Sequence, residues 1–581
     1  MKSSHVILMQ PILGPDCWKD NYNLSIMIYL LAANAVTLCH QVESRQGIKK
    51  LYRINELTDI ICHNSKDHVH IGTAILFHLK CMAKSHIYSE CLNVALKYLD
   101  SIGVTIDLNQ SAEKTASEIQ ETAKLFSEIR EEDISSMKIN NDVNILSALK
   151  ILVFLSSPLT NQDPKTKPII NTRILQLTHI HGLSVQSACG FLSLGLLLAS
   201  NGDKLGLTFG KVAIALGKNI PTDFQGMIPG IYNFFYGSIL PWFESIHNSL
   251  EPLVEAYVMG RESGNIPATR VSYIFYFMLA FVAGKSIEKL LKDVEDLNDI
   301  TSKLPPVVAA VHQVLMNLHF DDNTALSGDQ FNFEAFDDFG VFMEKPYIYL
   351  LVTINAYVLG KLTLALKYID AYTKHCSSSD RTIFYPIQNF YAGLSSIAIA
   401  KRTRQDSVVQ VVREIAIKLK DISNYSPKNF LNKVHLLEAE IAAVTGDTKQ
   451  AEVNYELSIS LSQEHMLKNE EAIACERAGI FFLDINEPDS GLKYLSKALK
   501  CYNEWGAKAK VKQLISQYPS LVAESNKSMS NLVGAIKEFH IVKSSHDSIS
   551  SSSHLSTRSS LKSNGNKSGG DKKRVRFSTL S

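Results

Sequence analysis

The sequence predicts an all-α fold, a superhelical array of helical hairpins that ends in a disordered C-terminal tail. Apolar residues recur with the period of an α-helix, and runs of strict two-residue alternation are scarce. Turns that carry Gly or Asn separate successive amphipathic segments. Of the 581 residues, 45% are hydrophobic and 20% are charged, a composition typical of a folded chain with several structural units.

Helical periodicity is clear in residues 490–502. Four large side chains of this segment fall at offsets of 0, 3, 7 and 10, which places them on one face of a helix. They are Leu492, Leu495, Leu499 and Tyr502. Pro488 ends the preceding element, and Asp489 or Ser490 can cap the new helix. We therefore expect an amphipathic helix here with one buried face.

The turns between such helices repeat. Each follows an apolar helix and opens an amphipathic one, and its Gly or Asn accepts the left-handed backbone that ends a helix. They begin at Gly202, Gly360, Gly446 and Asn486. The last two turns lie 40 residues apart, close to but longer than the period of about 34 residues in tetratricopeptide repeats. This spacing predicts stacked, tetratricopeptide-like hairpins.

Composition divides the chain into four segments. We expect an N-terminal stub at 1–17, a first helical-hairpin segment at 18–165, a main tetratricopeptide-like array at 166–520 and a Ser-rich basic tail at 521–581. Residues 541–581 contain 14 Ser and one aromatic residue. Such a segment buries too little apolar area to offset the entropy of ordering, so the tail is expected to be disordered.

Charge and hydropathy exclude two classes of partner. The chain has 59 basic and 58 acidic residues, a net charge of +1, so no global charge draws it to nucleic acid or an anionic membrane. The apolar stretches 25–36 and 272–284 are shorter than the roughly 20 residues of a membrane-spanning helix. We expect both to be buried helices of a bundle, and no membrane insertion.

The nine cysteines indicate a reducing compartment. They are scattered along the chain, and none forms a C-x-x-C pair. An odd, unclustered set in a large chain is typical of reduced packing residues in a cytoplasmic protein.

Two short motifs resemble parts of nucleotide sites, but each lacks its required partners. Residues 338–340 are the Asp-Phe-Gly tripeptide of protein kinases, without a Gly-rich loop, strand Lys or catalytic loop upstream. Residues 283–286, AGKS, end like a phosphate loop, yet Leu279 occupies the position of its first Gly. Neither motif predicts a nucleotide site.

Histidine pairs are the remaining candidates for a metal site. His68 with His70, and His179 with His181, are two residues apart, so on a helix each pair points to different faces. No acidic or Cys partners gather nearby in the sequence. We therefore expect no catalytic, cofactor-binding or metal-binding residues in this chain, and no cofactor.

Five stretches of the chain share their pattern with a known family. Four are residues 17–39, 181–200, 251–276 and 430–459. The fifth is the closing pair, in which the matching residues are Glu470, Ala472, Glu476, Trp505, Gly506, Ala507 and Lys508. On these stretches, residues 18–520 resemble the tetratricopeptide-like helical region of large ATPase-containing signalling kinases, the hybrid histidine kinases and related serine/threonine kinases.

The resemblance implies a role in signalling. In that family a kinase-like domain and an ATPase precede the array, and a sensor and histidine-kinase modules often follow it. We expect these domains to be missing before residue 18 and after residue 520, in a detached scaffold or a partial gene model. The leading hypothesis is therefore a non-catalytic scaffold for protein–protein interaction or regulation, with kinase or ATPase domains among its partners. The alternative is the regulatory middle fragment of a hybrid kinase whose ATPase and kinase domains lie outside this chain.

For the residues of the closing pair, we expect a structural role in the array rather than contact with a ligand. Trp505 is interpreted as a wedge that seats the last hairpin. Gly506 is interpreted as a residue that allows a bend in the backbone or the close approach of another element. A partner peptide would instead lie in a curved groove of the array, anchored by aromatic and apolar side chains.

The tail carries one suggestive motif, KKRVRFSTL at 572–580. Val575 and Phe577 would face one side of an extended strand behind the basic Arg574. This resembles the docking motif through which regulators add a strand to type-1 serine/threonine phosphatase. A basic targeting patch, or a solvated tail with no role, are the open alternatives. If the motif docks, phosphorylation of Ser578 should weaken docking, since it adds a charge of about −2 beside Phe577.

Overall fold

The computed structural model describes residues 14, 16–38, 45–156, 165–219, 226–298, 304–320, 327–333, 344–375, 382–403 and 406–521. Every regular element in these ranges is a helix, and the one β-type contact is an isolated bridge between Ile139 and Leu183. The prediction of an all-α array of helical hairpins is confirmed. The disorder predicted for the tail concerns residues that lie outside the described ranges.

The chain divides into two compact units. The first comprises Met1–Phe243, Glu255–Ser272 and Ser378–Ile383, and the second comprises Glu244–Val254, Tyr273–Ser377 and Phe384–Ser581. The boundary expected between 165 and 166 lies inside the first unit. The reason is that helices α8 (Val143–Leu155) and α9 (Thr166–His181) share one hydrophobic core.

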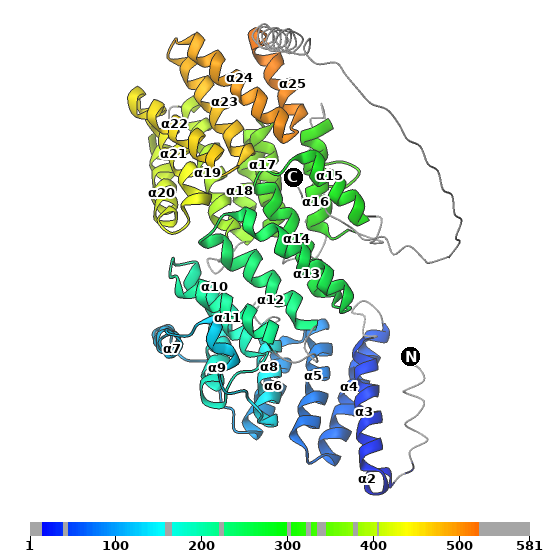
Figure 1. The fold of residues 1–581 in the computed structure, drawn as a ribbon. Helices are drawn as coiled ribbons and strands as arrows, with labels where there is room; N and C mark the ends of the chain where they lie inside the picture. Colours follow the sequence, from blue (N-terminus) through cyan, green and yellow to red (C-terminus); the bar gives the residue numbers. More distant parts are fainter. Residues whose placement is uncertain are drawn as a thin grey trace, which may run out of the picture. The chain divides into compact units, whose positions relative to one another are not determined.

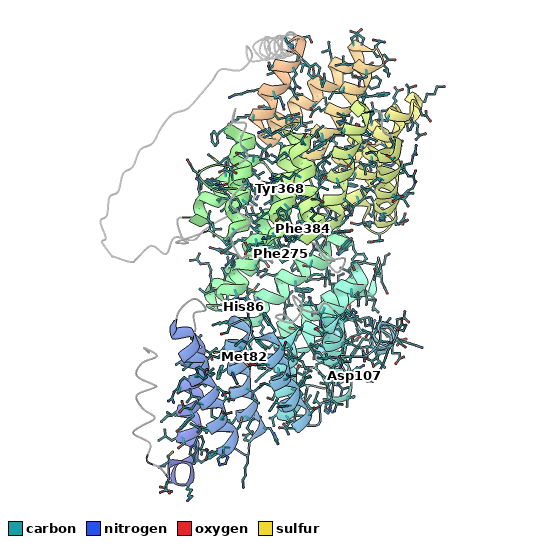
Figure 2. The ribbon with its side chains drawn as sticks, turned by 180° about the vertical axis from the view of Figure 1, so that it is seen from behind. Met82, His86, Asp107, Phe275, Tyr368 and Phe384 are labelled. Carbon is teal, nitrogen blue, oxygen red and sulfur yellow. The ribbon has the colours of Figure 1, made fainter. Side chains whose placement is uncertain are left out.

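The first unit contains helices that pack mostly on their neighbours in the chain, while α3 also packs on α5, α5 on α8 and α7 on α9 (Figure 1). Besides α8 and α9, they are α2 (Cys17–Asp20), α3 (Tyr22–Leu38), α4 (Arg45–Asn64), α5 (His68–Lys84), α6 (Tyr88–Ser101), α7 (Ala112–Leu125), α10 (Ser187–Ala199), α11 (Leu205–Asn219) and α12 (Ile228–Phe234). Met82 belongs to the core that α5, α6, α8 and α9 form together (Figure 2). Gly202, the first predicted turn, has a φ of +81° between α10 and α11.

The second unit carries the regular hairpins (Figure 1). Its described helices are α15 (Ile287–Asn298), α16 (Pro306–Phe320), α17 (Lys345–Val358), α18 (Leu362–His375), α19 (Phe384–Thr403), α20 (Asp406–Ser423), α21 (Pro427–Thr445), α22 (Thr448–Glu464), α23 (Lys468–Asp484), α24 (Pro488–Trp505) and α25 (Lys508–Gln517). Helices α13 (Leu250–Glu262) and α14 (Ile266–Val282) have residues in both units. The first helices of successive hairpins begin at 345, 384, 427, 468 and 508, a period of 39–43 residues.

Turn chemistry follows the sequence closely in these hairpins. Gly446 has a φ of +86° at the end of α21. The carboxylate of Asp447 then caps α22, because it accepts a hydrogen bond from the backbone N–H of Gln450 at 3.1 Å. Asn486 has a φ of +64°. The expected caps at Asp489 or Ser490 are wrong, because α24 begins at Pro488, a favoured first helical residue, and its N-cap position is Glu487.

The two long apolar stretches have different surroundings. Residues 276–283, at the end of α14, are all buried, as predicted. Residues 25–36 lie in α3, which packs on α4 and α5 but leaves Met27 and Leu31 exposed. The prediction of a buried helix is thus wrong for the face of α3 that carries Met27 and Leu31, because neighbouring helices do not cover it. No helix in the described part of the chain has the length and apolarity needed to cross a membrane.

Trp505 closes the second unit. Its side chain is 1% exposed, and its ring centroid lies 6.1 Å from that of Phe281 in α14. Gly506 ends α24 with a φ of +96°, and its carbonyl oxygen lies 2.9 Å from Nδ1 of His319 in α16. A Cβ at Gly506 would sit 3.2 Å from that of Ile287, so this position combines a bend with a close approach. The last hairpin is therefore held against the helices that begin the unit.

Removing the Trp505 side chain tests this closing contact. Trp505→Ala should cost about 3–5 kcal/mol of local stability, since it leaves a large cavity at a fully buried position. Protection against hydrogen exchange should fall over residues 468–520 while earlier hairpins keep theirs, because a repeat array frays from its end. The control Tyr385→Ala removes a side chain that is 42% exposed and should have little effect. Unchanged protection in 468–520 would contradict the closing role.

Candidate functional site

The residues singled out in the sequence do not form one site. Gly202 lies in the first unit, whereas Gly360, Gly446, Trp505 and Gly506 are hairpin ends in the second. The kinase-like tripeptide 338–340 and the tail residues Arg574, Val575, Phe577 and Ser578 lie outside the described residues. The Lys of the AGKS motif follows the end of α14.

That lysine, Lys285, is tied to a buried carboxylate. Its Nζ lies 3.4 Å from Oδ2 of Asp293, a residue of α15 with no exposed surface, and also contacts the hydroxyl of Tyr276. The same Asp293 oxygen accepts a hydrogen bond from the Tyr276 hydroxyl at 2.6 Å. Lys285 thus takes part in a polar contact between α14 and α15 of the second unit.

The best candidate for a site lies on the side of the second unit formed by the first helices of the hairpins. We call α17, α19, α21, α23 and α25, the first helices of the hairpins, the inner helices. Helix α17 packs on α19, α19 on α21 and α21 on α23, and α25 contacts α23 through Lys510 and Glu476. Charged side chains along them form an inner polar seam. Its members are Lys433, Glu440, Glu470, Glu476, Arg477 and Lys510.

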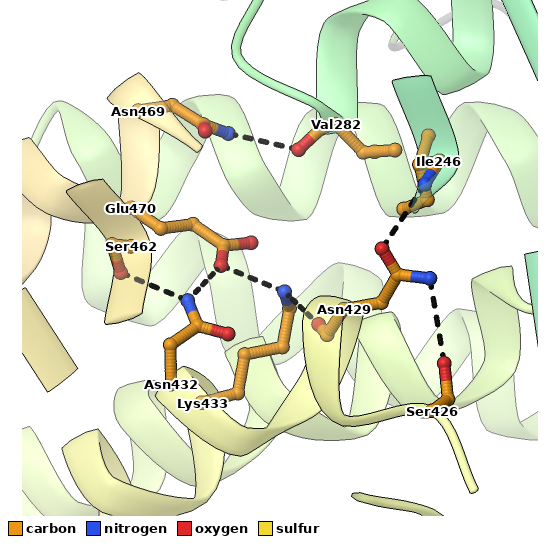
Figure 3. Close-up of polar contacts among 9 residues, drawn as sticks. All are labelled: Ile246, Val282, Ser426, Asn429, Asn432, Lys433, Ser462, Asn469 and Glu470. Atoms are coloured by element: carbon orange, nitrogen blue, oxygen red, sulfur yellow. Dashed lines mark hydrogen bonds and ion pairs between the residues drawn. The ribbon is translucent and has the colours of Figure 1, made fainter. Parts of the chain in front are cut away.

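The first layer of the inner polar seam is a fully buried ion pair (Figure 3). Nζ of Lys433 in α21 lies 2.7 Å from Oε2 of Glu470 in α23, and the two side chains are 2% and 3% exposed. Nδ2 of Asn432 donates to the same Glu470 oxygen at 2.5 Å and to Oγ of Ser462 at 3.0 Å. Lys433 also donates to its own helix, to the carbonyl of Asn429 at 2.6 Å.

Two asparagines join this layer to other parts of the second unit (Figure 3). Oδ1 of Asn429 accepts from the backbone N–H of Ile246 at 3.1 Å. Its Nδ2 donates to the carbonyl of Glu244, which Figure 3 does not draw, at 2.7 Å. Nδ2 of Asn469 donates to the carbonyl of Val282, the last residue of α14, at 3.2 Å. These hydrogen bonds to backbone groups fix the first turns of α21 and α23.

The second layer is a bidentate pair between the same two helices. Nε and Nη2 of Arg477 in α23 each lie 2.7 Å from an oxygen of Glu440 in α21. The Tyr455 hydroxyl donates to Oε1 of Glu440 at 2.7 Å. Bidentate, charge-assisted contacts of this kind are among the strongest polar interactions in a protein interior.

A third layer connects α23 to the last inner helix. Nζ of Lys510 in α25 lies 2.7 Å from Oε1 of Glu476, and the Tyr502 hydroxyl donates to the other Glu476 oxygen at 2.6 Å. Both side chains of the ion pair are largely buried. The inner polar seam thus carries three cations and three carboxylates, each paired with its opposite.

Burial and pairing shift the pKa values along the seam. Burial opposes ionisation of Glu440, but Arg477 and the Tyr455 hydroxyl outweigh it and hold the pKa of the carboxyl below its ordinary value. Because the pKa is lower in the folded state, the stabilisation from Glu440 is present above the unfolded-state pKa. It is lost as the pH falls through the folded-state value. Burial, followed by the charge of Glu440, raises the pKa of Tyr455 well above 10.

Beyond the second and third layers, the inner helices open into a cavity of about 510 Å³. Its walls combine aromatic, aliphatic and charged side chains from α17, α19, α23 and α25. They include Tyr357, Ala398, Lys401, Glu476, Arg477, Ile480, Asp484, Lys510, Gln513 and Tyr518. Lys401 and Asp484 form an ion pair at the wall, and both are partly exposed.

Gln513 carries an unused hydrogen-bonding group in this cavity. Its Nε2 donates to the carbonyl of Leu359 at 3.3 Å, which fixes the amide. Its Oε1 is buried and has no hydrogen-bond partner. A buried acceptor without a partner costs free energy, so an incoming N–H group would be stabilised there.

Sequence reasoning singled out Glu470 and Glu476 by their family pattern and missed the rest of the seam. A signal was present, because α21 carries Lys433 and Glu440 seven residues apart, and α23 carries Glu470 and Arg477 at the same spacing with opposite signs. Both pairs are separated by 37 residues, close to one repeat period. Equal spacing of opposite charges on two helices of a repeat predicts two ion pairs.

The described residues offer no group of three or more His, Cys, Asp and Glu side chains that could hold a metal ion. The seven described cysteines are free thiols, and most are buried. The cavity can therefore contribute hydrogen bonds, ion pairs and apolar contacts to a ligand. No family model matches the chain, and no curated protein matches it.

Deleting one half of the first layer tests the energetics of the seam. Lys433→Met should cost about 3–5 kcal/mol, since it leaves the Glu470 carboxylate buried without its cation. Adding Glu470→Leu should recover most of this loss, because no uncompensated charge remains. Urea unfolding provides the free energies. The control Lys420→Met breaks an exposed ion pair with Glu438 and should cost less than about 1 kcal/mol. A double variant no more stable than Lys433→Met would contradict the pairing.

Proposed function

We propose that this chain is a non-catalytic helical-repeat scaffold in signal transduction, and that it holds an extended peptide segment of a partner protein in the inner cavity. One observation carries the proposal. The cavity between α17, α19, α23 and α25 is lined by charged groups, aromatic rings and Gln513, whose buried Oε1 has no hydrogen-bond partner, and the inner polar seam holds these walls in place.

The chemistry of the walls suits a peptide backbone. An extended segment brings N–H and C=O groups that need partners when they leave water. Oε1 of Gln513 can accept from such an N–H group. Lys401, whose side chain is 35% exposed, can donate to a carbonyl or carboxylate of the guest while it stays near Asp484.

The cavity favours side chains of mixed character. Tyr357 and Tyr518 offer aromatic surface, and Ala398 and Ile480 offer aliphatic surface for an apolar anchor. The charged residues of the walls include both signs, so neither a strongly basic nor a strongly acidic guest is favoured. We therefore propose a guest with one or two apolar anchors flanked by single charges.

The resemblance to hybrid signalling kinases supports a kinase or ATPase domain as the source of this segment, and a cytoplasmic scaffold is part of the same proposal. A second protein contact through Arg574, Val575 and Phe577, with type-1 phosphatase as the partner, is a separate proposal about the tail. It rests on the sequence motif.

Peptide selection against the purified full chain tests the cavity. A displayed library of random 12-residue peptides is panned on the chain, and the dissociation constants of enriched peptides are measured by fluorescence anisotropy. Gln513→Leu removes the unpaired acceptor, and Lys401→Glu reverses a charge at the wall. Each change should weaken binding at least about tenfold, the equivalent of 1.4 kcal/mol.

The control is Lys449→Glu, a charge reversal at an exposed residue of α22 away from the cavity, which should leave affinity unchanged. Circular dichroism checks that all variants keep the helical fold. Enriched peptides that bind every variant equally well would contradict the proposed function, and so would a selection that enriches none.

A further inference from the structure

A second surface, in the first unit, has the features of a binding groove. It lies between α3 and α5, where two adjoining cavities of about 430 and 410 Å³ share Asn34 and Phe77 as common lining residues. The helices run in the same direction, since Tyr22 contacts His70 at one end and Lys84 donates to the carbonyl of Thr37 at the other. The groove therefore follows most of α3, which with 17 residues is about 25 Å long.

An exposed apolar stripe on α3 borders the groove, and its residues Met27, Leu31 and Leu38 line the groove itself. Leu24, Met27, Leu31 and Leu38 are 45%, 52%, 48% and 75% exposed. With Asn34 they are spaced by three, four, three and four residues. This is the spacing of residues that contact a neighbouring helix along a seam. Helix α3 already packs on α4 and α5, so an exposed stripe of four large apolar side chains on its other face indicates an interaction surface.

The opposite wall has the same spacing and a different chemistry. On α5, His70, Thr73, Phe77, Lys80 and Lys84 are also spaced by three, four, three and four residues, and all five line the groove. The α5 wall of the groove is thus apolar at its centre, at Phe77, and carries two cations, Lys80 and Lys84, near the end of the helix.

These two cations have no carboxylate partner among the described residues. Lys84 donates to the carbonyl of Thr37 at 3.0 Å, and Nζ of Lys80 lies 5.8 Å from the ring centroid of Phe77. Burial, followed by the charge of Lys84, lowers the pKa of Lys80. A carboxylate placed at this end would relieve the repulsion between the two ammonium groups.

Charge decides what can occupy the groove. Helix α3 contains no charged residue, so the stripe of a second copy carries no carboxylate of its own for Lys80 and Lys84, and the nearest acidic residues of that copy, Asp16 and Asp20, precede the stripe. Residues 1–13 of the chain contain no acidic residue either, and Pro11 disfavours a continuous helix there. An acidic amphipathic helix from another protein satisfies both the apolar stripe and the cations.

We propose that the groove between α3 and α5 binds one amphipathic helix of a partner protein, with apolar side chains at i, i+3 or i+4 and i+7 and with acidic residues in its last turn. The apolar side chains pack on Met27, Leu31 and Phe77. The last turn lies at Lys80 and Lys84, where its carboxylates and the negative end of the helix dipole face the two ammonium groups. This contact is independent of the inner cavity of the second unit.

Two synthetic helical peptides of 18 residues test the groove on the full chain. Both carry Leu at the seam positions and Ala elsewhere, and they differ in having two Glu or two Lys in the last turn. Fluorescence anisotropy should show the Glu peptide binding at least about tenfold more tightly than the Lys peptide. Lys80→Glu with Lys84→Glu should reverse this preference, and Met27→Asp with Leu31→Asp should abolish binding of both peptides.

The control Lys97→Glu reverses a charge on an exposed residue of α6 and should leave both affinities unchanged. Equal binding of the two peptides, or a preference that the double lysine reversal leaves in place, would overturn the proposal. A wild-type dimer in sedimentation that Met27→Asp with Leu31→Asp converts to a monomer would show that a second copy occupies the groove, which also overturns it. Tighter peptide binding after Ile7→Asp with Leu8→Asp would show that the chain's own N-terminus occupies it.

Discussion

The second unit depends on two buried ion pairs between neighbouring inner helices, Lys433 with Glu470 and Glu440 with Arg477. A charge without a partner in a protein interior costs several kcal/mol, so only one register of α21 on α23 pairs all four groups. A shift by one helical turn would leave charges buried alone. The pairs are therefore less a source of net stability than a constraint on how the two hairpins can stack.

The position of the cavity wall depends on the register of α21 on α23. Arg477 and Glu476 are adjacent on α23, so the same helix that fixes the register also presents the cavity wall and the contact to Lys510 of α25. Trp505 and Gly506 hold α25 against α14 and α16, which closes the array at its end. Because these contacts fix the helices around the cavity, we expect a rigid site, which loses less entropy when it binds.

Much of the architecture could be predicted from sequence, because helical periodicity and hairpin turns are local properties. The turns at Gly446 and Asn486 depend on a few neighbouring residues, whereas the burial of Trp505 against Phe281 is a long-range contact that its place in the family pattern indicated. The inner polar seam could not be found by the same reasoning, since Lys433 and Arg477 look like ordinary solvated residues until their partners one repeat away are considered. Sequence alone also overstated the burial of α3, because hydropathy does not reveal that neighbours cover only one of its faces.

The role of the two ion pairs is tested most directly by exchanging the charges within one helix and then restoring complementarity in the next. Lys433→Glu with Glu440→Lys places like charges opposite each other in both layers. Adding Glu470→Lys with Arg477→Glu makes the layers complementary again with reversed signs. The free energy of unfolding is followed through Trp505 fluorescence in a Trp18→Phe, Trp242→Phe background. If the ion pairs fix how the hairpins stack, the exchange in α21 alone costs more than about 3 kcal/mol, and the fourfold variant recovers at least about half of that loss. A fourfold variant as unstable as the sum of the two double exchanges would contradict the central role of the ion pairs.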